Sequence, residues 1–483
     1  MTAAIPGLDP SAARDLRARL TGELVLPEDA AYDDGRRVWN GMIDKRPAAI
    51  VRPRSEPDVA AAILTARVNG LQIAVRGGGH NIAGASTVDG GMVIDLRLLN
   101  AVTVDADARR AIVGGGALLR ELDSATAAVG LCTTAGMVSH TGVGGLTLGG
   151  GYGWLARMYG LACDNLVGVT VVTAAGEVVR ATETENADLL WGLRGGGGNF
   201  GVATEFEFRL HRLPPVVSGG TSFFRYDDAL PVIRNLLAAA DGFPDRFLGI
   251  AAATLGRADH HLPAEFIGQP VAAIDWGYLG EYDEGRRVIE PVIAGHSPVL
   301  ETPVSAGRSY RDLQTQSDEN MHPGQRMYWK SSFISSLPDA GIEAFLTRGA
   351  GSESPVAGVE IVQLGGAISR VGEDDTAFSH RDARFDFLAV SGWEDPAEDD
   401  VRIEHVRRAW GAVAPFASQG SYVNNMGDEG NDRVRAAYGD AKYRRLQALK
   451  DRYDPDNVFH RNANIRPSAI AGPGGQERSA AIS

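Results

Sequence analysis

A run of three glycines between two polar side chains is the stretch best suited to chemistry. It reads Arg76-Gly77-Gly78-Gly79-His80-Asn81. Because glycine has no Cβ, the backbone N–H groups of such a run can approach a bound anion closely, and positive φ costs little. Arg76 adds a permanent cation and His80 a nucleophilic imidazole. The stretch predicts a phosphate-binding loop that ends in a reactive histidine. The alternative is a glycine turn followed by a surface histidine.

Two further glycine-rich loops follow along the chain. They read Gly142-Val-Gly-Gly-Leu-Thr-Leu-Gly-Gly-Gly-Tyr-Gly153 and Arg194-Gly-Gly-Gly-Gly-Asn-Phe-Gly201. The latter contains Gly196-x-Gly198-x-x-Gly201, which binds dinucleotides when it follows a strand and opens a helix. Here a predicted helix with Trp191 precedes the loop and a strand follows it, which is the reverse order. An NAD-dependent dehydrogenase therefore stays only as an alternative.

Two motifs near the C-terminus complete the pattern, Tyr453-Asp-Pro-Asp-Asn-Val-Phe459 and Asn462-Ala-Asn-Ile465. Together with the glycine loops they resemble the FAD-linked oxidases of the vanillyl-alcohol oxidase superfamily, in particular the berberine-bridge-enzyme-like branch. The resemblance covers nearly the whole chain. It implies an α+β, two-domain FAD-binding fold of the para-cresol methylhydroxylase type with an antiparallel-sheet substrate domain. It also implies hydride transfer from a small organic substrate to the flavin, which dioxygen reoxidises to give hydrogen peroxide.

The resemblance assigns His80 a covalent bond to the 8α-carbon of the flavin. Attack on that carbon needs a neutral imidazole nitrogen that is held rigidly, and a histidine at the end of a glycine loop supplies both. The alternative is that His80 only hydrogen-bonds the cofactor. Many members have a second, cysteinyl bond, but the aligned position here is Val138, and Cys132 lies six residues upstream. The resemblance thus implies FAD that is linked through His80 alone.

Leu146 occupies a position where the family usually has a histidine. Backbone N–H groups or other side chains must then stabilise negative charge on the flavin. We expect the cofactor site to extend along the first two glycine loops, part of the third and the C-terminal motif. The predicted cofactor-binding residues are His80, Arg76, Gly77, Gly78, Gly79, Asn81, Gly84, Val138, Ser139, Gly142, Gly144, Gly145, Gly149, Gly150, Gly201, Val202, Asn424, Asn462 and Asn464.

The substrate side departs from the family pattern. A Tyr-x-Asn-Tyr motif often supplies a tyrosine base, whereas this chain has Tyr422-Val-Asn424-Asn425. An amide cannot deprotonate an alcohol, so the change favours an amine-type substrate or a base from elsewhere. It also leaves open a flavin-binding protein without turnover. The candidate catalytic residues are Gln363, Asn425, Tyr422 and His140, followed by Tyr278, Tyr328 and Glu360; for each of them, a place in the core or at its rim is the alternative.

Composition narrows the partners and the setting. The 483 residues allow two or three domains, and the net charge of −14 disfavours nucleic acid. Cys132 and Cys163 are the only cysteines, which excludes a disulfide framework and a four-cysteine zinc site and fits a reducing compartment. His322 and the pair His260-His261 lack partners at metal-ligand spacing, so no metal is expected. The N-terminus lacks signal-peptide features and no run reaches 18 apolar residues, so we expect a cytoplasmic protein without membrane contact.

The predicted elements place the motifs in two domains. A short buried strand through Ile73 and Val75 leads into the first glycine run, after a helix that Ser55 caps and Gly70 ends. Pro214-Pro215 marks a boundary, beyond which an antiparallel sheet with helices on one face leaves the other face free to cover a ligand. An apolar rim of that sheet could support a homodimer. We predict a cofactor domain at 1–216, a substrate domain at 217–419, a return to the cofactor domain at 420–467 and a mobile tail at 468–483.

Overall fold

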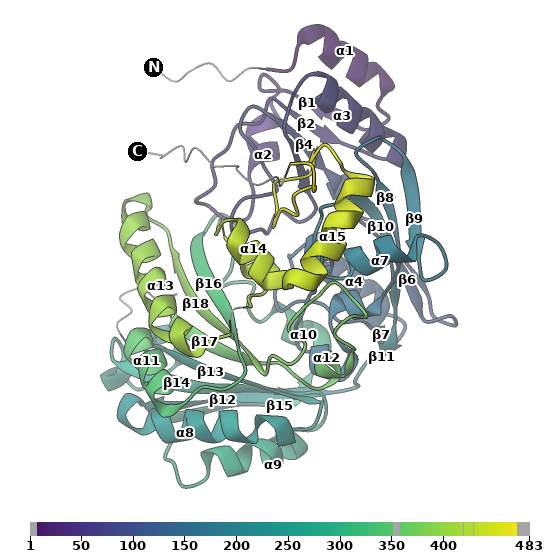
Figure 1. Ribbon diagram of the computed structural model, residues 1–483. Coiled ribbons are helices and arrows are strands. Elements are labelled where there is room, and N and C mark those ends of the chain that lie inside the picture. Colours follow the sequence, from purple (N-terminus) through teal and green to yellow (C-terminus); the bar gives the residue numbers. More distant parts are fainter. Residues whose placement is uncertain (1–6, 351–357, 419, 428, 471–483) are drawn as a thin grey trace.

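The computed structural model describes residues 7–350, 358–418, 420–427 and 429–470. Their strands form a four-stranded, a five-stranded and a seven-stranded sheet, together with a two-stranded ribbon of β7 (Leu131–Cys132) and β11 (His211–Arg212) (Figure 1). Most of the predicted tail, residues 471–483, lies outside the described residues. None of the helices in the described ranges has the length and apolarity that a membrane span needs.

The four-stranded sheet positions the first glycine run. Its order is β1 (Glu23–Val25), β2 (Ala49–Arg52), β4 (Met92–Asp95), β3 (Ile73–Arg76), and the last three strands run parallel. Helix α3 (Glu56–Val68) joins β2 to β3 and packs Val59 and Ile63 into the same core as Ile94. The glycine run therefore leaves the carboxyl end of a buried parallel strand. Helices α1 (Pro10–Arg19) and α2 (Tyr32–Arg36) complete this part.

Helix α3 has the ends that its sequence predicts. Ser55 Oγ accepts a hydrogen bond from the N–H of Asp58 at 3.4 Å, and Gly70 has a φ of +64°. The buried carboxylate of Asp58 extends this cap, because it accepts the backbone N–H groups of Thr21, Gly22 and Arg54. Asp58 thereby ties the segment after α1 to the start of α3.

The five-stranded sheet is antiparallel and contains two hairpins, one of β5 with β6 and one of β8 with β9. Its order is β5 (Val102–Asp105), β6 (Arg110–Gly114), β10 (Val202–Arg209), β8 (Leu166–Val172), β9 (Val178–Thr182). Around it lie α4 (Leu119–Ala127), α5 (Val143–Leu148), α7 (Ala187–Leu193), α14 (Asn431–Tyr438) and α15 (Asp440–Tyr453), whereas α6 (Ala156–Tyr159) packs toward the seven-stranded sheet. Helices α14 and α15 share a core with Trp191 and Phe200, so the end of the chain returns to the first half of the molecule (Figure 1).

The seven-stranded antiparallel sheet forms the other half. Its order is β15 (Leu300–Arg308), β12 (Val217–Arg225), β14 (Pro270–Tyr278), β13 (Phe247–Leu255), β17 (Gly358–Gln363), β18 (Phe385–Trp393), β16 (Arg326–Ile334). One face packs against α8 (Tyr226–Ala239), α9 (Tyr282–Ile293), α11 (Asp339–Ala350) and α13 (Asp399–Val413) (Figure 1). The opposite face, here called the loop face, shares apolar clusters with Trp39, Trp154 and Tyr422 of the glycine-loop half. Helices α10 (Tyr310–Thr315) and α12 (Ala367–Arg370) lie in the connections.

A buried ion pair secures the C-terminal motif. Lys450 Nζ lies 2.6 Å from Asp454 Oδ2, and neither side chain has exposed surface. Lys450 also donates to the carbonyls of Asn199 and Phe459, both at 2.9 Å. Asp454 accepts the N–H groups of Val458 and Phe459, both at 2.8 Å. This network joins the third glycine loop to the Tyr453–Phe459 motif.

Replacing Lys450 by methionine is expected to lower the free energy of unfolding by about 3–5 kcal/mol, because the carboxylate of Asp454 stays buried without its cation. Urea denaturation followed by tryptophan fluorescence measures the change. Arg452→Met is the matched control. The pair that Arg452 forms with Asp188 is 59% and 44% exposed, and such pairs contribute at most about 1 kcal/mol. Equal losses in the two variants would contradict the role given to Lys450.

Candidate active site

The glycine loops contact each other backbone to backbone. A Cβ added to Gly78 would lie 2.3 Å from the backbone nitrogen of Gly142, and one added to Gly77 or Gly144 would lie 3.0 or 3.1 Å from the carbonyl oxygen of Gly115. These glycines are therefore needed so that the loops can pack together. Gly145 differs, because a Cβ there would meet no atom within 4 Å. The backbone at Gly145 is open to a ligand.

Gly78→Ala is expected to force the first two glycine loops apart. Overpacking of this kind costs about 1–3 kcal/mol of stability, and bound cofactor should fall with it. Thermal unfolding and the content of bound cofactor would both be measured. Gly411→Ala on α13 is the control, since a Cβ at Gly411 meets no atom within 4 Å, and alanine in a helix is favoured over glycine by roughly 0.5–1 kcal/mol. Unchanged stability of Gly78→Ala would refute this account of the contact.

His80 is held between aromatic rings. Its ring stacks on Trp39 with centroids 4.0 Å apart at an interplanar angle of 15°, and it lies 5.2 Å from the ring of His140. Nε2 of each histidine is buried, and neither has a hydrogen-bond partner among the described residues. Burial, reinforced by His140, lowers the pKa of His80 to about 3. His80 is thus a neutral, oriented imidazole with an unused nitrogen.

Trp39 and Asn40 connect this histidine to the seven-stranded sheet. The Trp39 backbone N–H donates to the carbonyl of Gly79 at 3.1 Å, and its indole Nε1 donates to Met321. Asn40 exchanges hydrogen bonds with the backbone of Met327 on β16, at 2.9 and 3.1 Å. The first glycine run is therefore fixed relative to the loop face of the sheet.

A buried carboxyl lies on that face. Asp386, on β18, accepts a hydrogen bond from the hydroxyl of Tyr152 at 2.7 Å and one from the amide of Asn425 at 3.1 Å, both on Oδ2. Its side chain has no exposed surface, and Oδ1 has no partner in the described part of the chain. Burial raises the pKa of Asp386 to about 7. A carboxyl of this kind can take or give a proton near neutral pH.

Tyr422 and Asn424 hold the second glycine loop. The hydroxyl of Tyr422 accepts the N–H of Gly151 at 2.8 Å and an amide N–H of Asn424 at 2.7 Å, and Asn424 also donates to Leu146. A Cβ on Gly149 would lie 2.1 Å from Oδ1 of Asn424. Burial raises the pKa of Tyr422 further above its ordinary value. Tyr422 is therefore protonated at neutral pH and positions the loop.

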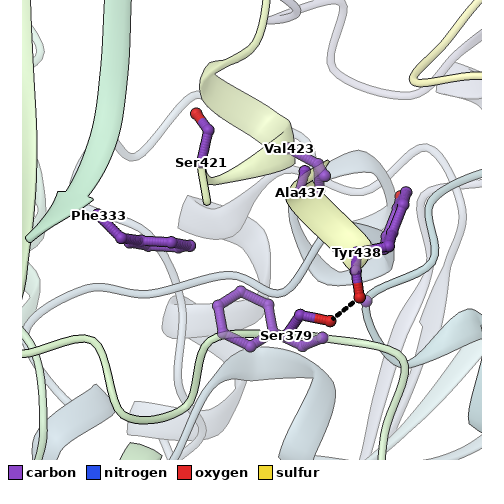
Figure 2. A pocket seen from close by; sticks show the side chains of 8 residues that line it. Phe333, Ser379, Ser421, Val423, Ala437 and Tyr438 are labelled. Atoms are coloured by element: carbon purple, nitrogen blue, oxygen red, sulfur yellow. Dashed lines mark hydrogen bonds between the residues drawn. The ribbon is translucent and has the colours of Figure 1, made fainter. Parts of the chain in front are cut away.

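A small pocket lies beside Tyr422, between β16 and the end of α14 (Figure 2). Figure 2 shows Ser379 donating to the carbonyl of Tyr438 at 2.7 Å beside Phe333. Its volume of about 10 Å³ holds at most one water molecule. An organic substrate does not fit there. Its lining residues are Gly195, Phe333, Phe378, Ser379, Ser421, Val423, Ala437 and Tyr438.

Comparisons with known proteins decide the family. The profile of the FAD binding domain matches residues 47–182, and the profile named berberine and berberine like matches residues 421–466. The (R)-6-hydroxynicotine oxidase of Paenarthrobacter nicotinovorans is 32% identical over 467 residues, which cover 93% of this chain and 97% of that protein. The chain belongs to the berberine-bridge-enzyme-like FAD-linked oxidases.

Solved structures of such oxidases share the fold. The crystal structure of 6-hydroxy-D-nicotine oxidase from Arthrobacter nicotinovorans superposes with a TM-score of 0.82 at 32% identity and covers 92% of this chain and 98% of that one. Glucooligosaccharide oxidase from Acremonium strictum, whose structure is described with a 6-S-cysteinyl, 8α-N1-histidyl FAD, gives 0.82 at 25% identity, covering 95% and 99%. These comparisons confirm the predicted fold class. They also confirm that the protein is an FAD-dependent oxidase that acts on small organic substrates and uses dioxygen.

The residues around the first glycine run are compatible with a bound FAD. Nε2 of His80, which has no hydrogen-bond partner among the described residues, and the open backbone at Gly145 are compatible with a flavin held at this run. The third glycine loop has the order expected from the sequence, with α7 before it and β10 after it. That order leaves the NAD-dependent alternative without its structural context.

Several predicted cofactor residues contact the protein itself. Arg76 donates through Nη1 to the carbonyl of Gly35 at 2.7 Å, Asn81 accepts the N–H of Ala85 at 3.0 Å, and Ser139 bonds Asp318 at 2.6 Å through its hydroxyl. These side chains shape the walls of the site. Their contact with FAD stays a prediction.

The remaining predicted cofactor positions differ in their surroundings. The side chains of Val138 and Val202 are buried, and a Cβ on Gly201 would lie 2.4 Å from Val171. Asn464 keeps a buried Oδ1 without a partner among the described residues. Asn462 is exposed beside Gly198, and Gly79, Gly84 and Gly150 have φ values of 72°, 68° and 129°.

The structure corrects three substrate-side candidates. Gln363 accepts the N–H of Gly249 at 3.1 Å and donates to the carbonyl of Ala240 at 2.8 Å, on the helix-covered face. Tyr278 and Tyr328 also belong to that face, because they pack in the core beneath the helices. Successive residues of a strand point to opposite faces, so Glu360 and Val362 lie on the loop face and Gln363 does not.

Sequence reasoning missed Asp386, Tyr152 and Trp39. Asp386 had a usable signal, because an aspartate between Phe385 and Phe387 interrupts an otherwise apolar strand. Tyr152 belongs to a loop that was interpreted through its glycines. Trp39 stands 41 residues before His80, and only the fold brings the two together.

Proposed function

We propose that His80 is the single covalent attachment point of FAD. The observation that carries this proposal is a neutral imidazole, stacked on Trp39, whose Nε2 is buried without a partner among the described residues. Cys132 has no matching environment, since it lies in an apolar cluster with Trp154 and Tyr310 and its Sγ faces the carbonyl of Arg212 at 3.6 Å. Bound FAD would accept the hydride from the substrate, and dioxygen would then reoxidise the reduced flavin.

Asp386 is the proton acceptor in this proposal. As the substrate loses a hydride from carbon, the neighbouring N–H or O–H must lose a proton, and the product is an imine or a carbonyl compound. Oδ1 of Asp386, which has no hydrogen-bond partner among the described residues, would take that proton, while Tyr152 and Asn425 hold Oδ2. Asn425 thus has a role that an amide can perform, which is to orient the base. The lost tyrosine of the motif is replaced by a carboxyl from the sheet.

Anaerobic mixing with a panel of secondary amines, alcohols and oligosaccharides tests this function. A true substrate bleaches the flavin absorbance without oxygen, and readmission of air restores it with one hydrogen peroxide per flavin. A panel that leaves the flavin oxidised would instead favour a flavin-binding protein without turnover.

The proposed cofactor-binding and substrate-binding regions coincide with the predicted domains. Residues 1–216 and 420–467 are assigned to the cofactor and 217–419 to the substrate, supported by separate hydrophobic cores around the five-stranded and seven-stranded sheets. A cytoplasmic location and a homodimer belong to the same proposal, and size-exclusion chromatography of the purified enzyme tests the latter.

A further inference from the structure

The loop face of the seven-stranded sheet carries two carboxyl groups besides Asp386. Glu360 on β17 lies opposite Ala252 of β13, and Asp275 on β14 lies opposite Ile250 of the same strand. Residues two apart on a strand share a face, so both carboxyl groups lie on the loop face of the sheet, on the two strands that flank β13. Glu360 is also a diagonal neighbour of Asp386, whose partner on β17 is Val362, and such diagonal pairs are about 7–8 Å apart.

Among the described residues, neither of these two carboxyl groups forms an ion pair, although the positive charge of Arg308 favours the ionised form of Asp275. Asp275 accepts a hydrogen bond from the hydroxyl of Thr221 at 3.1 Å. Within the described ranges, Glu360 forms no hydrogen bond or ion pair. Burial raises the pKa of both groups, and Asp275 raises that of Glu360 further. Ionised carboxylates are costly in such a setting, and a bound cation would reduce that cost.

The surroundings supply the rest of a site for an organic cation. Leu388, in register with Glu360, and Val390 beyond it are half-buried apolar side chains on the same face. Trp329 packs beside them in a cluster with Trp39. Its side chain is only 8% exposed, and its indole nitrogen is buried without a hydrogen-bond partner in the described part of the chain. Apolar walls and aromatic faces suit a ring-bearing ammonium ion better than a sugar.

We infer that Glu360, with Asp275 behind it, binds a cationic nitrogen of the substrate and makes this oxidase select amines over neutral alcohols and sugars. The inference rests on the proposed function, because it concerns the same site. Asp386 and Glu360 then have separate tasks: Asp386 removes a proton at the reacting bond, and Glu360 holds the positive charge. Selection would be expressed in the binding constant more than in the rate of flavin reduction.

The test compares two ligands that differ only in charge. A cyclic secondary amine joined to a phenol ring and its neutral cyclopentyl analogue would be titrated into the holoenzyme while the flavin spectrum is recorded. We expect Glu360→Gln to raise the Kd of the amine at least tenfold and to change that of the neutral analogue less than twofold. Asp275→Asn should give a smaller shift in the same direction.

Glu404→Gln is the matched control, because Glu404 is an exposed carboxylate on α13 that pairs with Arg408 at 3.7 Å. It should leave both binding constants unchanged. Equal weakening of both ligands by Glu360→Gln, or wild-type enzyme that binds the neutral analogue as tightly as the amine, would overturn the inference. Failure of the proposed function differs from both outcomes: ligands would perturb the spectrum, but none would bleach it anaerobically.

Discussion

Replacing His80 by alanine is expected to abolish covalent flavin while the protein still folds. Acid precipitation separates the two forms of the cofactor, because linked flavin stays with the pellet and free flavin enters the supernatant. The wild-type pellet should be yellow and fluorescent, and the His80→Ala pellet should be colourless. The physical reason is that an uncharged imidazole nitrogen is the nucleophile for the bond, and alanine removes it without adding a charge to the glycine loop.

Cys132→Ala is the control for this experiment. Burial raises the pKa of the Cys132 thiol to about 12, so the reactive thiolate is scarce at neutral pH. This variant should keep its flavin in the pellet. A colourless pellet from Cys132→Ala would reveal a second link. Flavin released wholly from the wild-type protein would make His80 a non-covalent contact and withdraw the proposed attachment.

Local patterns predicted much of the fold. Glycine runs, caps and apolar alternation indicated α3, the strand β3 before the first glycine run and an antiparallel sheet after Pro215. They succeed because short-range backbone preferences determine these elements. The helix α5 inside the second glycine loop was not predicted, since Gly144 and Gly145 are poor helix formers. Its position depends on backbone contact with Gly78 and Gly115, which are far away in the sequence.

The cofactor side of the candidate site was inferred from local sequence, whereas three substrate-side candidates were assigned to the wrong face of the sheet. His80 follows directly from the local sequence Gly-Gly-Gly-His. The face on which a strand residue lies depends on a register that only tertiary structure fixes, and a shift of one residue exchanges the faces. Gln363 and Glu360 are three residues apart on β17 and therefore point to opposite sides. Asp386 acquires its role from Tyr152 and Asn425, which approach it from distant parts of the chain.

Replacing Asp386 by asparagine is expected to slow anaerobic flavin reduction by about 10²–10⁴-fold, which is the usual contribution of a general base. The wild-type rate should rise with pH through the pKa of about 7 of Asp386, since only the ionised carboxylate accepts a proton. The variant should lose that dependence. Glu360→Gln is the comparison: it should change ligand binding and keep the rise with pH.

The Asp386→Asn variant should be slower than wild type in flavin reduction but more stable to unfolding. This combination distinguishes the loss of a base from damage to the fold. The pKa of Asp386 is raised by burial in the folded protein, whereas the unfolded chain has a value near 3.9. Between these values the folded state binds the additional proton, so this group lowers stability as pH rises from about 4 to about 7. Asparagine has nearly the same shape and no charge to bury. Asp386→Asn should therefore unfold at a higher temperature than wild type at pH 8, with the difference shrinking at pH 5. An inactive variant that is more stable than wild type at pH 8 would show that the buried carboxylate lowers stability and is needed for proton transfer. An inactive variant that is less stable at both pH values would instead assign Asp386 to the packing of the sheet.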